Sequence, residues 1–599
     1  MFSGSKPFIV LIILLWNTSE VTPSQVYPTP NEIIDRAWEI MGSIRSIRKV
    51  KNFNIDGTGM IHASIMKELR SLKDDIHYLE EAASSKLKTV NQTIADVVPR
   101  IFREMYYIQD CFETFLQFYE TSGKSSQEKT IESVNKILTP MTTSTWKARR
   151  VIRNLITNIT ESGLFEIFEP SMSRSRRFRD SMQQLIYKFF KSLAMSQVKA
   201  LIITSYAYTT TGFFEESDYE LWLRDEKSQL REILNDMFKT SQRAINGATQ
   251  SVFPYHPLTK TDDAYMEVQV FQKYIIPKLD MGSMWSAMFD TCSKFRGAKS
   301  DCSSIHCRRE SERKRCKGVL FNCAEISGIA DVCYAPLSSE RRYNWMKIDE
   351  GKIFGRNDSC LTVQRVAPEF RSGFCMCDCE YVEGNINRHF SLGEALSSLS
   401  DNKIIIGARL VLRCHVFHIQ IKQGKLRENG FVDDDTEWVE IDEVSQSSSP
   451  SDLTADKMLH TVTWNKDTII VGTIMGNPNM ILTGLKFGVI DGKLELLIRL
   501  TAFDFKTGKL NESITGWSSL DPDARGDAKF MTTNLRSDLG QRTMPLLNKL
   551  DVVVDPVTPL IGAGLFVYED PKRVQYLGLK LIHHSLDMFF WKYLPPPSY

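Results

Sequence analysis

The segment SGFCMCDCEY, residues 372–381, places a cysteine at every second position, as Cys375, Cys377 and Cys379. In an extended strand, alternate side chains point to the same face. Successive sulfur atoms then lie about 7 Å apart, which is too far for them to share one zinc ion. We therefore expect each of these cysteines to form a disulfide with a different partner. A bridge between two of them would indicate a turn instead.

The cysteines as a whole favour a disulfide framework. Eleven of the twelve lie between Cys292 and Cys414, at spacings that match neither the paired cysteines of zinc sites nor the C-x-x-C of redox proteins. Cysteines this dense become disulfides in an oxidising compartment. We expect no metal and no cofactor. The expected framework contains Cys111, Cys292, Cys302, Cys307, Cys316, Cys323, Cys333, Cys360, Cys375, Cys377, Cys379 and Cys414.

The odd number of cysteines in the cluster draws attention to Cys111, which lies far away in the helical region. We favour a disulfide between Cys111 and the cluster, which would tie the two regions together. Alternatively, Cys111 is a buried free thiol, and one cysteine of the cluster is unpaired or intermolecular.

The N-terminal residues predict export. Lys6, an apolar run over 8–16 and a polar stretch over 17–25 have the order of a secretory signal peptide, assigned to residues 1–24. The apolar run is shorter than the roughly 20 residues that span a bilayer, and no later run is long enough, so we expect no transmembrane segment. Four sequons predict N-glycosylation at Asn91, Asn158, Asn357 and Asn511. We expect a secreted, extracellular glycoprotein.

Residues 25–250 are predicted to form a helical bundle. Apolar residues recur at steps of mostly three and four from Ile65 to Val97, which is the pattern of a coiled-coil helix. Pro99 is expected to end this helix. A long helix needs partners to cover its apolar stripe, so an antiparallel bundle is expected. Further helices are predicted over 101–119, 128–139, 141–161, 178–208 and 219–245.

The remainder predicts a cysteine-rich region over 251–400 and a β-rich domain over 401–599. Short β-branched and aromatic runs fill the last region, and Asp491-Gly492 between two alternating runs indicates a hairpin. The predicted fold is a multidomain α+β chain, with an N-terminal long-helix bundle, a disulfide-rich middle and an antiparallel β-sandwich-like C-terminal domain.

No catalytic motif is found: the chain has no H-E-x-x-H, no G-x-S-x-G and no P-loop. His415 and His418 are predicted to lie on one strand, where they point to opposite faces and make poor joint metal ligands. The 74 basic and 73 acidic residues give no overall field directed at nucleic acid, so no nucleic-acid partner is expected.

Three short segments have both a functional and a plain interpretation. Arg525, Gly526 and Asp527 resemble the integrin-recognition tripeptide, which needs a guanidinium and a carboxylate held apart on a flexible loop; a chance match is the alternative. Arg174, Arg176 and Arg177 resemble a furin-type processing site, or form a solvated loop. The basic residues within 307–317 form either a patch for sulfated glycans or anionic lipid, or a solvated loop.

Three segments carry a family resemblance: FGRNDSCLTVQRVAPEFRSGFCMCDC, ARLVLRCHVFHIQIKQGKL and LRSDLGQRTMPLLNKLDVVVDPVTPLIGAGLFVYEDPKRVQYLGLKL. They resemble an insect family of secreted proteins of unknown function, some of which are similar to salivary-secretion proteins of blood feeders. The likeness is strongest over residues 290–590. It implies an extracellular location and no established activity, and it transfers no functional residue.

The sequence supports three hypotheses of function. The first is a secreted, non-enzymatic binding protein whose unknown ligand is a glycan, a lipid or a host protein. The second is a membrane-active or lipid-binding protein, because a helical bundle followed by β domains is also the layout of some pore-forming toxins. The third is an enzyme whose site is assembled from scattered residues.

Overall fold

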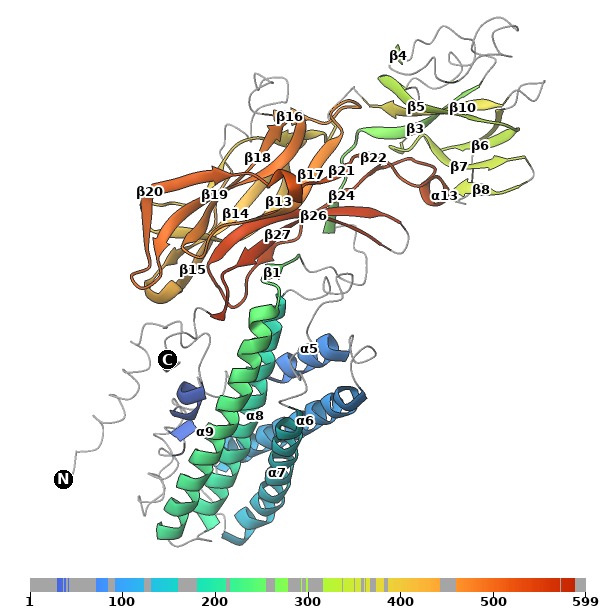
Figure 1. Cartoon of the computed structure of the whole chain (residues 1–599). Helices are drawn as coiled ribbons and strands as arrows, with labels where there is room; N and C mark the ends of the chain where they lie inside the picture. The colour runs from blue at the N-terminus through green and yellow to red at the C-terminus, as the bar shows by residue number, and fades with distance from the viewer. Residues whose placement is uncertain are drawn as a thin grey trace, which may run out of the picture. The chain divides into compact units, whose positions relative to one another are not determined.

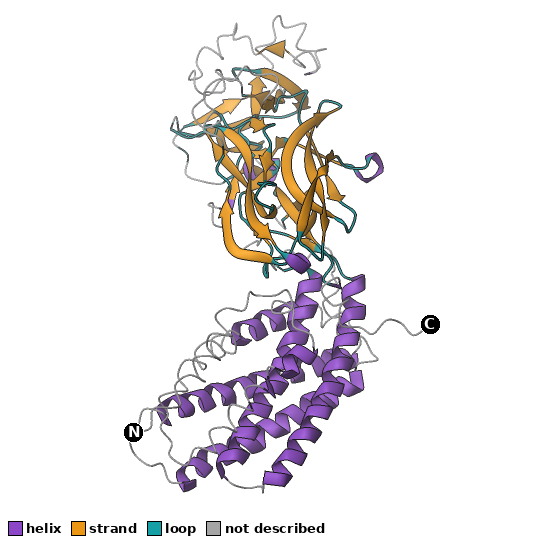
Figure 2. Cartoon of the chain, turned by 90° about the vertical axis from the view of Figure 1, so that its left-hand side faces the viewer, coloured by secondary structure: helices purple, strands orange, loops and turns teal. Residues whose placement is uncertain are grey.

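The computed structural model describes residues 30–35, 37–38, 41, 72–84, 92–122, 131–159, 180–211, 216–254, 264–277, 292, 298–299, 316–336, 338–349, 351–356, 360, 362–366, 373–381, 386–441, 459–570 and 573–587. The chain divides into two compact units. The first unit contains residues 1–251 and 584–599, and the second contains residues 252–583. Long helices make up the described part of the first unit, and strands make up most of the second (Figures 1 and 2). The fold is therefore a mixture of α and β, and the predicted signal peptide lies outside the described residues.

Five long helices are described in the first unit: α5 Leu72–Ser84, α6 Gln92–Ser122, α7 Ile131–Ile159, α8 Met182–Thr211 and α9 Glu216–Gly247. The last two lie close to the helices predicted over 178–208 and 219–245. The predicted coiled-coil helix is described only in part, by α5 and the start of α6, because residues 65–71 and 85–91 lie outside the described residues.

The expectation that Pro99 ends a helix is wrong. Helix α6 runs through Pro99, and α7 runs through Pro140, which joins the two helices predicted over 128–139 and 141–161. A proline inside a helix cannot donate to the carbonyl group one turn earlier. Both prolines are exposed, so water can satisfy those carbonyl groups. Packing of the apolar faces on either side then keeps each helix continuous.

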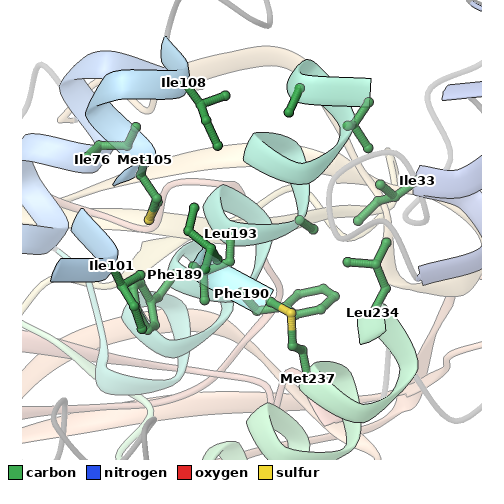
Figure 3. Packing of buried hydrophobic residues seen from close by; sticks show 14 of the residues in the cluster. Ile33, Ile76, Ile101, Met105, Ile108, Phe189, Phe190, Leu193, Leu234 and Met237 are labelled. Carbon is green, nitrogen blue, oxygen red and sulfur yellow. The ribbon is translucent and has the colours of Figure 1, made fainter. Parts of the chain in front are cut away.

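Helix α8 is buried on nearly every side, because apolar residues of the other helices pack around it. Its Phe189 ring lies 5.4 Å from the ring of Phe102 in α6, and its Phe190 ring lies 5.4 Å from that of Phe238 in α9. Figure 3 shows part of this core, in which side chains of α5, α6, α8 and α9 meet. A helix that is covered all round is typical of the centre of a helical unit.

The end of the described chain belongs to this helical core. Leu586 is fully buried in it. The backbone N–H of Leu586 donates to Oε1 of Gln183 at 3.0 Å, and Nε2 of Gln242 donates to Oδ1 of Asp587 at 2.8 Å. The β-rich domain predicted over 401–599 therefore ends before the C-terminus, and the chain's last described residues complete the helical unit.

Two large sheets dominate the second unit. The first has eleven strands, in the order β12-β18-β19-β17-β26-β27-β24-β2, with β1 beside β27, β20 beside β19 and β21 beside β17. Its strands are β1 Ser251–Val252, β2 Tyr265–Met266, β12 Ala395–Leu396, β17 Thr468–Met475, β18 Met480–Ile490, β19 Lys493–Asp504, β20 Lys509–Ser518, β21 Gly526–Lys529, β24 Leu546–Asn548, β26 Leu560–Glu569 and β27 Gln575–His583.

The second large sheet has six strands, in the order β16-β11-β14-β13-β25, with β15 beside β14. The two sheets share one hydrophobic core. Phe390 lies at their meeting point, with its ring 4.9 Å from Phe417 of its own sheet and 5.4 Å from Phe487 of the other. The strands of the six-stranded sheet are β11 His389–Ser391, β13 Lys403–Arg413, β14 Val416–Leu426, β15 Val432–Trp438, β16 Leu459–Thr461 and β25 Val552–Val553.

Two four-stranded sheets lie in the cysteine-rich part of the second unit, in the orders β3-β10-β5-β4 and β8-β7-β6-β9. A small core that includes Met376, Ile275 and Met346 joins them. A two-stranded sheet pairs β22 with β23, and three short helical turns are bounded within the part of this unit that the structure describes. The elements are β3 Phe271–Pro277, β4 Ala298–Lys299, β5 Val319–Ile326, β6 Ala330–Tyr334, β7 Tyr343–Ile348, β8 Ile353–Gly355, β9 Val363–Val366, β10 Phe374–Glu380, β22 Met531–Thr532, β23 Thr543–Met544, η8 Glu428–Gly430, η9 Pro522–Ala524 and α13 Leu535–Asp538.

Two hairpin turns differ in how well the sequence predicts them. Asp491 and Gly492, with φ of 52° and 74°, connect β18 to β19 as predicted. The β13–β14 turn consists of Cys414 and His415, with φ of 46° and 67°. The prediction that His415 and His418 share one strand is wrong, because His415 lies in the turn and His418 lies in β14. Neither cysteine nor histidine signals a turn that needs two positive φ angles, so no local residue predicts a break in the apolar run there.

Candidate functional site

Strand β10 answers the question posed by the alternating cysteines. It is extended, it is buried at every position, and it pairs with β3 on one side and β5 on the other. Cys375 bonds to Cys292, Cys377 to Cys323 and Cys379 to Cys316. The prediction that each cysteine has a different partner is confirmed. The three bridges form one face of the strand, within a small cysteine-rich core.

The opposite face of β10 carries buried charges, and each of them has a partner. The carboxylate of Asp378 lies 2.9 Å from Nζ of Lys273, its register partner on β3, and accepts a hydrogen bond from the hydroxyl of Thr532. The carboxylate of Glu380 lies 2.6 Å from Nη2 of Arg388. Both carboxylates are paired within the fold, so this face fixes β10 against its neighbours and offers no free acid or base.

Arg342 contacts the disulfide face of β10, a role that was not predicted from the sequence. It is 1 % exposed, and its guanidinium donates to Sγ of Cys379 at 3.2 Å and to Oε1 of Gln272 at 3.1 Å. The guanidinium carbon also lies within 6 Å of the ring centroids of Tyr274 and Tyr381. This arginine therefore locks the bridge at the end of β10.

The remaining cysteines divide into three groups. Cys333 bonds to Cys360, which gives four disulfides in the described part of the chain. The favoured tie between Cys111 and the cluster is wrong: Cys111 is a half-buried free thiol, and burial raises its pKa. Cys414 lies exposed in the β13–β14 turn and is in none of these four bridges. Cys302 and Cys307 lie outside the described residues.

Several histidines gather near the β11–β14–β16 part of the six-stranded sheet. Burial lowers the pKa of His389, His418 and His460 to about 4 in each case. Nδ1 of His389 lies 2.9 Å from the Thr461 hydroxyl, and Nδ1 of His415 lies 2.9 Å from Oδ1 of Asn387. Within the described ranges, no three histidine, cysteine, aspartate or glutamate side chains converge as a metal site would require. Because their pKa values are lowered, His389, His418 and His460 are neutral near pH 7.

The Arg525-Gly526-Asp527 tripeptide is not displayed on a flexible loop. Gly526 and Asp527 begin strand β21, which pairs with β17. Nη2 of Arg525 lies 3.4 Å from the buried carboxylate of Glu495, and Asp527 lies 2.6 Å from Nζ of Lys493. Arg525 is therefore partly buried and paired, whereas Asp527 is exposed beside Lys493, and integrin-type recognition by this segment stays a prediction.

Only some of the other predicted sites lie within the described residues. Arg174, Arg176 and Arg177 lie outside the described residues, as does most of the basic segment 307–317. Of the sequons, Asn91 and Asn357 also lie outside them, and Asn158 lies in the last turn of α7. Asn511 is exposed on β20. No helix in the described part of the chain is long and apolar enough to cross a membrane.

The helical unit contains one charge cluster that sequence reasoning missed. Lys199, on the enclosed helix α8, is hydrogen-bonded to Oε1 of Gln109, and its Nζ lies 5.4 Å from the centroid of the Phe112 ring. Burial lowers the pKa of Lys199 to about 7, although the charges of Glu113 and Asp75 oppose this shift. Two residues before Lys199 on α8, Gln197 accepts a hydrogen bond from Arg149 of α7, which also pairs with Glu226.

The strongest candidate for ligand contact is a surface that we call the Trp517 face, defined by Glu394, Lys486, Arg499 and Trp517. Trp517 of β20 lies directly opposite Arg499 of β19, so both side chains are on the same face of the sheet. Nζ of Lys486, on β18, lies 4.1 Å from the centroid of the Trp517 ring and 2.8 Å from Oε1 of Glu394. Lys486, Arg499 and Trp517 are all partly exposed.

Beneath this surface, polar groups hold Arg499 in place. Its Nη2 donates to the backbone oxygen of Thr483 at 2.9 Å, and its Nε donates to the Thr483 hydroxyl at 3.2 Å. The Thr483 hydroxyl lies 2.8 Å from that of Thr501, which receives a hydrogen bond from Thr515. Partial burial lowers the pKa of Arg499, and Glu394 opposes that shift. The Trp517 face thus combines an indole ring with preorganised cations.

Comparisons with known proteins add one finding. A family model described as a domain of unknown function (DUF4803) matches residues 175–421. Among curated proteins, none matches the chain. The matched segment contains α8, α9, β10 with its three bridges, and the histidines at 389, 415 and 418, whereas Trp517 and Arg499 lie beyond it. The chain is therefore similar, over this segment, to a family whose function is not defined.

Proposed function

We propose that the chain is an extracellular, non-enzymatic binding protein, and that its Trp517 face binds an acidic glycan. The observation that carries the binding proposal is the partly exposed Trp517 ring, which has Nζ of Lys486 4.1 Å from its centroid and Arg499 directly opposite it on β19. An indole ring packs on the C–H face of a sugar, and its N–H is a polar handle. Ammonium and guanidinium groups complement the carboxylates or sulfates of an acidic sugar.

The disulfides support the extracellular location. Three bridges from one strand, and a fourth nearby, fit an oxidising compartment better than the reducing cytosol. The predicted signal peptide and the resemblance to secreted insect proteins are in keeping with this. We also propose the finer architecture, in which α5–α9 form a bundle around α8 and the two large sheets form a sandwich. The common cores of the helices and of the two sheets support it.

The binding proposal is tested with immobilised heparin and its fully desulfated form. The full chain is expected to bind the sulfated polymer, and Trp517→Ala or Arg499→Gln is expected to weaken binding at least tenfold. The matched control is Trp438→Ala, because Trp438 forms a similar pair with Arg409, at 4.1 Å, on the other large sheet. An equal loss of heparin binding in Trp438→Ala, or full heparin binding by Trp517→Ala, would contradict the assignment of the binding site to the Trp517 face.

A further inference from the structure

Strand β20 contains a local break in its ladder that coincides with a sequon. Thr501 pairs with Thr515, but the next residue, Ala502, pairs with Asn511. Residues 512–514 therefore lie outside the ladder as a bulge. All residues from 511 to 514 are exposed, and Ile514 is 55 % exposed. The sequon Asn511-Glu512-Ser513 thus begins at the last paired residue and continues into the bulge.

Inside the bulge, the sequon closes on itself. The Ser513 hydroxyl donates to Oδ1 of Asn511 at 2.6 Å, and the Ser513 backbone N–H donates to the same oxygen at 3.2 Å. Both donors polarise the side-chain amide through its oxygen. They leave Nδ2, the atom that a glycan modifies, uninvolved in this closure. The hydroxyl at the third position is the group that the sequon requires.

The bulge also lies at a sheet edge. Among the strands that the structure describes, β20 pairs with β19 alone. An exposed edge of ten residues presents unpaired backbone groups to any other strand, and proteins usually block such edges. A bulky, solubilising group at this position would prevent a second chain from pairing with β20.

We propose that Asn511 carries an N-linked glycan, and that this glycan blocks the open edge of β20. In the modification, Nδ2 of Asn511 attacks the anomeric carbon of an oligosaccharide that is joined to a polyprenyl diphosphate. The N–C bond forms as the bond between that carbon and the diphosphate oxygen breaks. The amide nitrogen loses one proton, and the polyprenyl diphosphate leaves with the bonding electron pair, so no oxidant or reductant is needed.

This inference rests on the proposed extracellular location, so the experiment tests the glycosylation of Asn511 separately from export by the native signal. The full chain is produced in a eukaryotic secretory line behind a strong heterologous signal peptide, which ensures entry into the lumen. The secreted protein is treated with peptide-N-glycosidase in ¹⁸O-water, and the peptide that contains residue 511 is analysed by mass spectrometry. We expect conversion of Asn511 to ¹⁸O-labelled aspartate in most molecules. An unmodified Asn511 peptide from secreted protein would overturn the assignment without bearing on export by the native signal.

Variants test the role of the glycan at the edge. Asn511→Gln and Ser513→Ala both remove the sequon, whereas Ser513→Thr keeps it. By light scattering, we expect Asn511→Gln and Ser513→Ala to self-associate at least twofold more than the chain without substitutions. Ser513→Thr should self-associate no more than that chain. In the Asn511→Gln background, Ile514→Lys places a charge on the bulge and should restore the dispersed state. If glycosylated and unglycosylated proteins associate equally, the glycan does not block the edge.

Discussion

At the scale of single residues, burial is the largest cause of the lowered pKa of three histidines. His418 is 4 % exposed, and burial is the first cause of its lowered pKa, with the nearby Arg413 adding to it. Its Nε2 has no hydrogen-bond partner among the described residues. Burial is also the first cause of the lowered pKa values of His389 and His460. These imidazoles therefore contribute to folding as neutral, nearly apolar groups.

These histidines predict a loss of stability in mild acid. The pKa of His418 is about 4 in the folded chain, against 6.5 for an ordinary imidazole. Between these values the unfolded chain binds a proton that the folded chain does not, so the free energy of unfolding falls as the pH drops from 6.5 to 4. His418→Phe should remove one such group. Relative to the unmodified chain, it should gain about 2 kcal/mol on going from pH 7.5 to pH 5.

The measurement is urea-induced unfolding, followed by circular dichroism of the β signal at the two pH values. His77→Gln is the control, because His77 is exposed on a helix of the other unit. A His418→Phe variant with the same pH dependence as the unmodified chain would show that His418 is solvated when the protein is folded.

At the scale of elements, β10 is the strand whose structure followed most directly from the sequence. If the segment is extended, the alternation of cysteines predicts three separate bridges, because side-chain direction in a strand depends only on parity. The identity of the partners could not be predicted, since it depends on which loops the fold brings beside β10. The two proline-containing helices and the Cys414–His415 turn were missed for a related reason. In each of these segments, packing of the flanking residues outweighed the conformation that the local residues prefer.

Chemical cleavage can test the pairing of β10 directly. Cyanogen bromide cuts after Met376, and endoproteinase Asp-N cuts before Asp378, so together they separate Cys375, Cys377 and Cys379 without reduction. Mass spectrometry should then find Cys375 linked to the peptide of Cys292, Cys377 to that of Cys323 and Cys379 to that of Cys316. A reduced and re-oxidised sample serves as the scrambled control. A peptide that joins two of the three β10 cysteines would contradict the extended strand.

At the scale of the whole molecule, the sequence predicted a helical bundle over 25–250, a cysteine-rich region over 251–400 and a β-rich domain over 401–599. The structure places residues 252–583 in one unit, and the change at residue 251 lies where the helical pattern stops. The sequence did not predict that the chain returns to the first unit at residue 584. Residues 584–587 are too few to show a helical or strand period, so only tertiary structure reveals their place. The Trp517 face was missed for the same reason, since its four residues come from separate strands and the loop before β12.

The return of the chain predicts that the helical unit depends on residues near the C-terminus. Leu586 is fully buried among helical side chains, and its backbone N–H is bonded to Gln183 of α8. Leu586→Ala would leave a cavity in that core and should lower the free energy of unfolding of the helices by about 2–4 kcal/mol. Thermal unfolding followed at 222 nm, where helices dominate the signal, should show a lower midpoint. The matched control is Leu221→Ala, because Leu221 is 61 % exposed on α9 and its truncation removes little buried surface. If both variants unfold at the same temperature as the unmodified chain, residues 584–587 do not stabilise the helical unit.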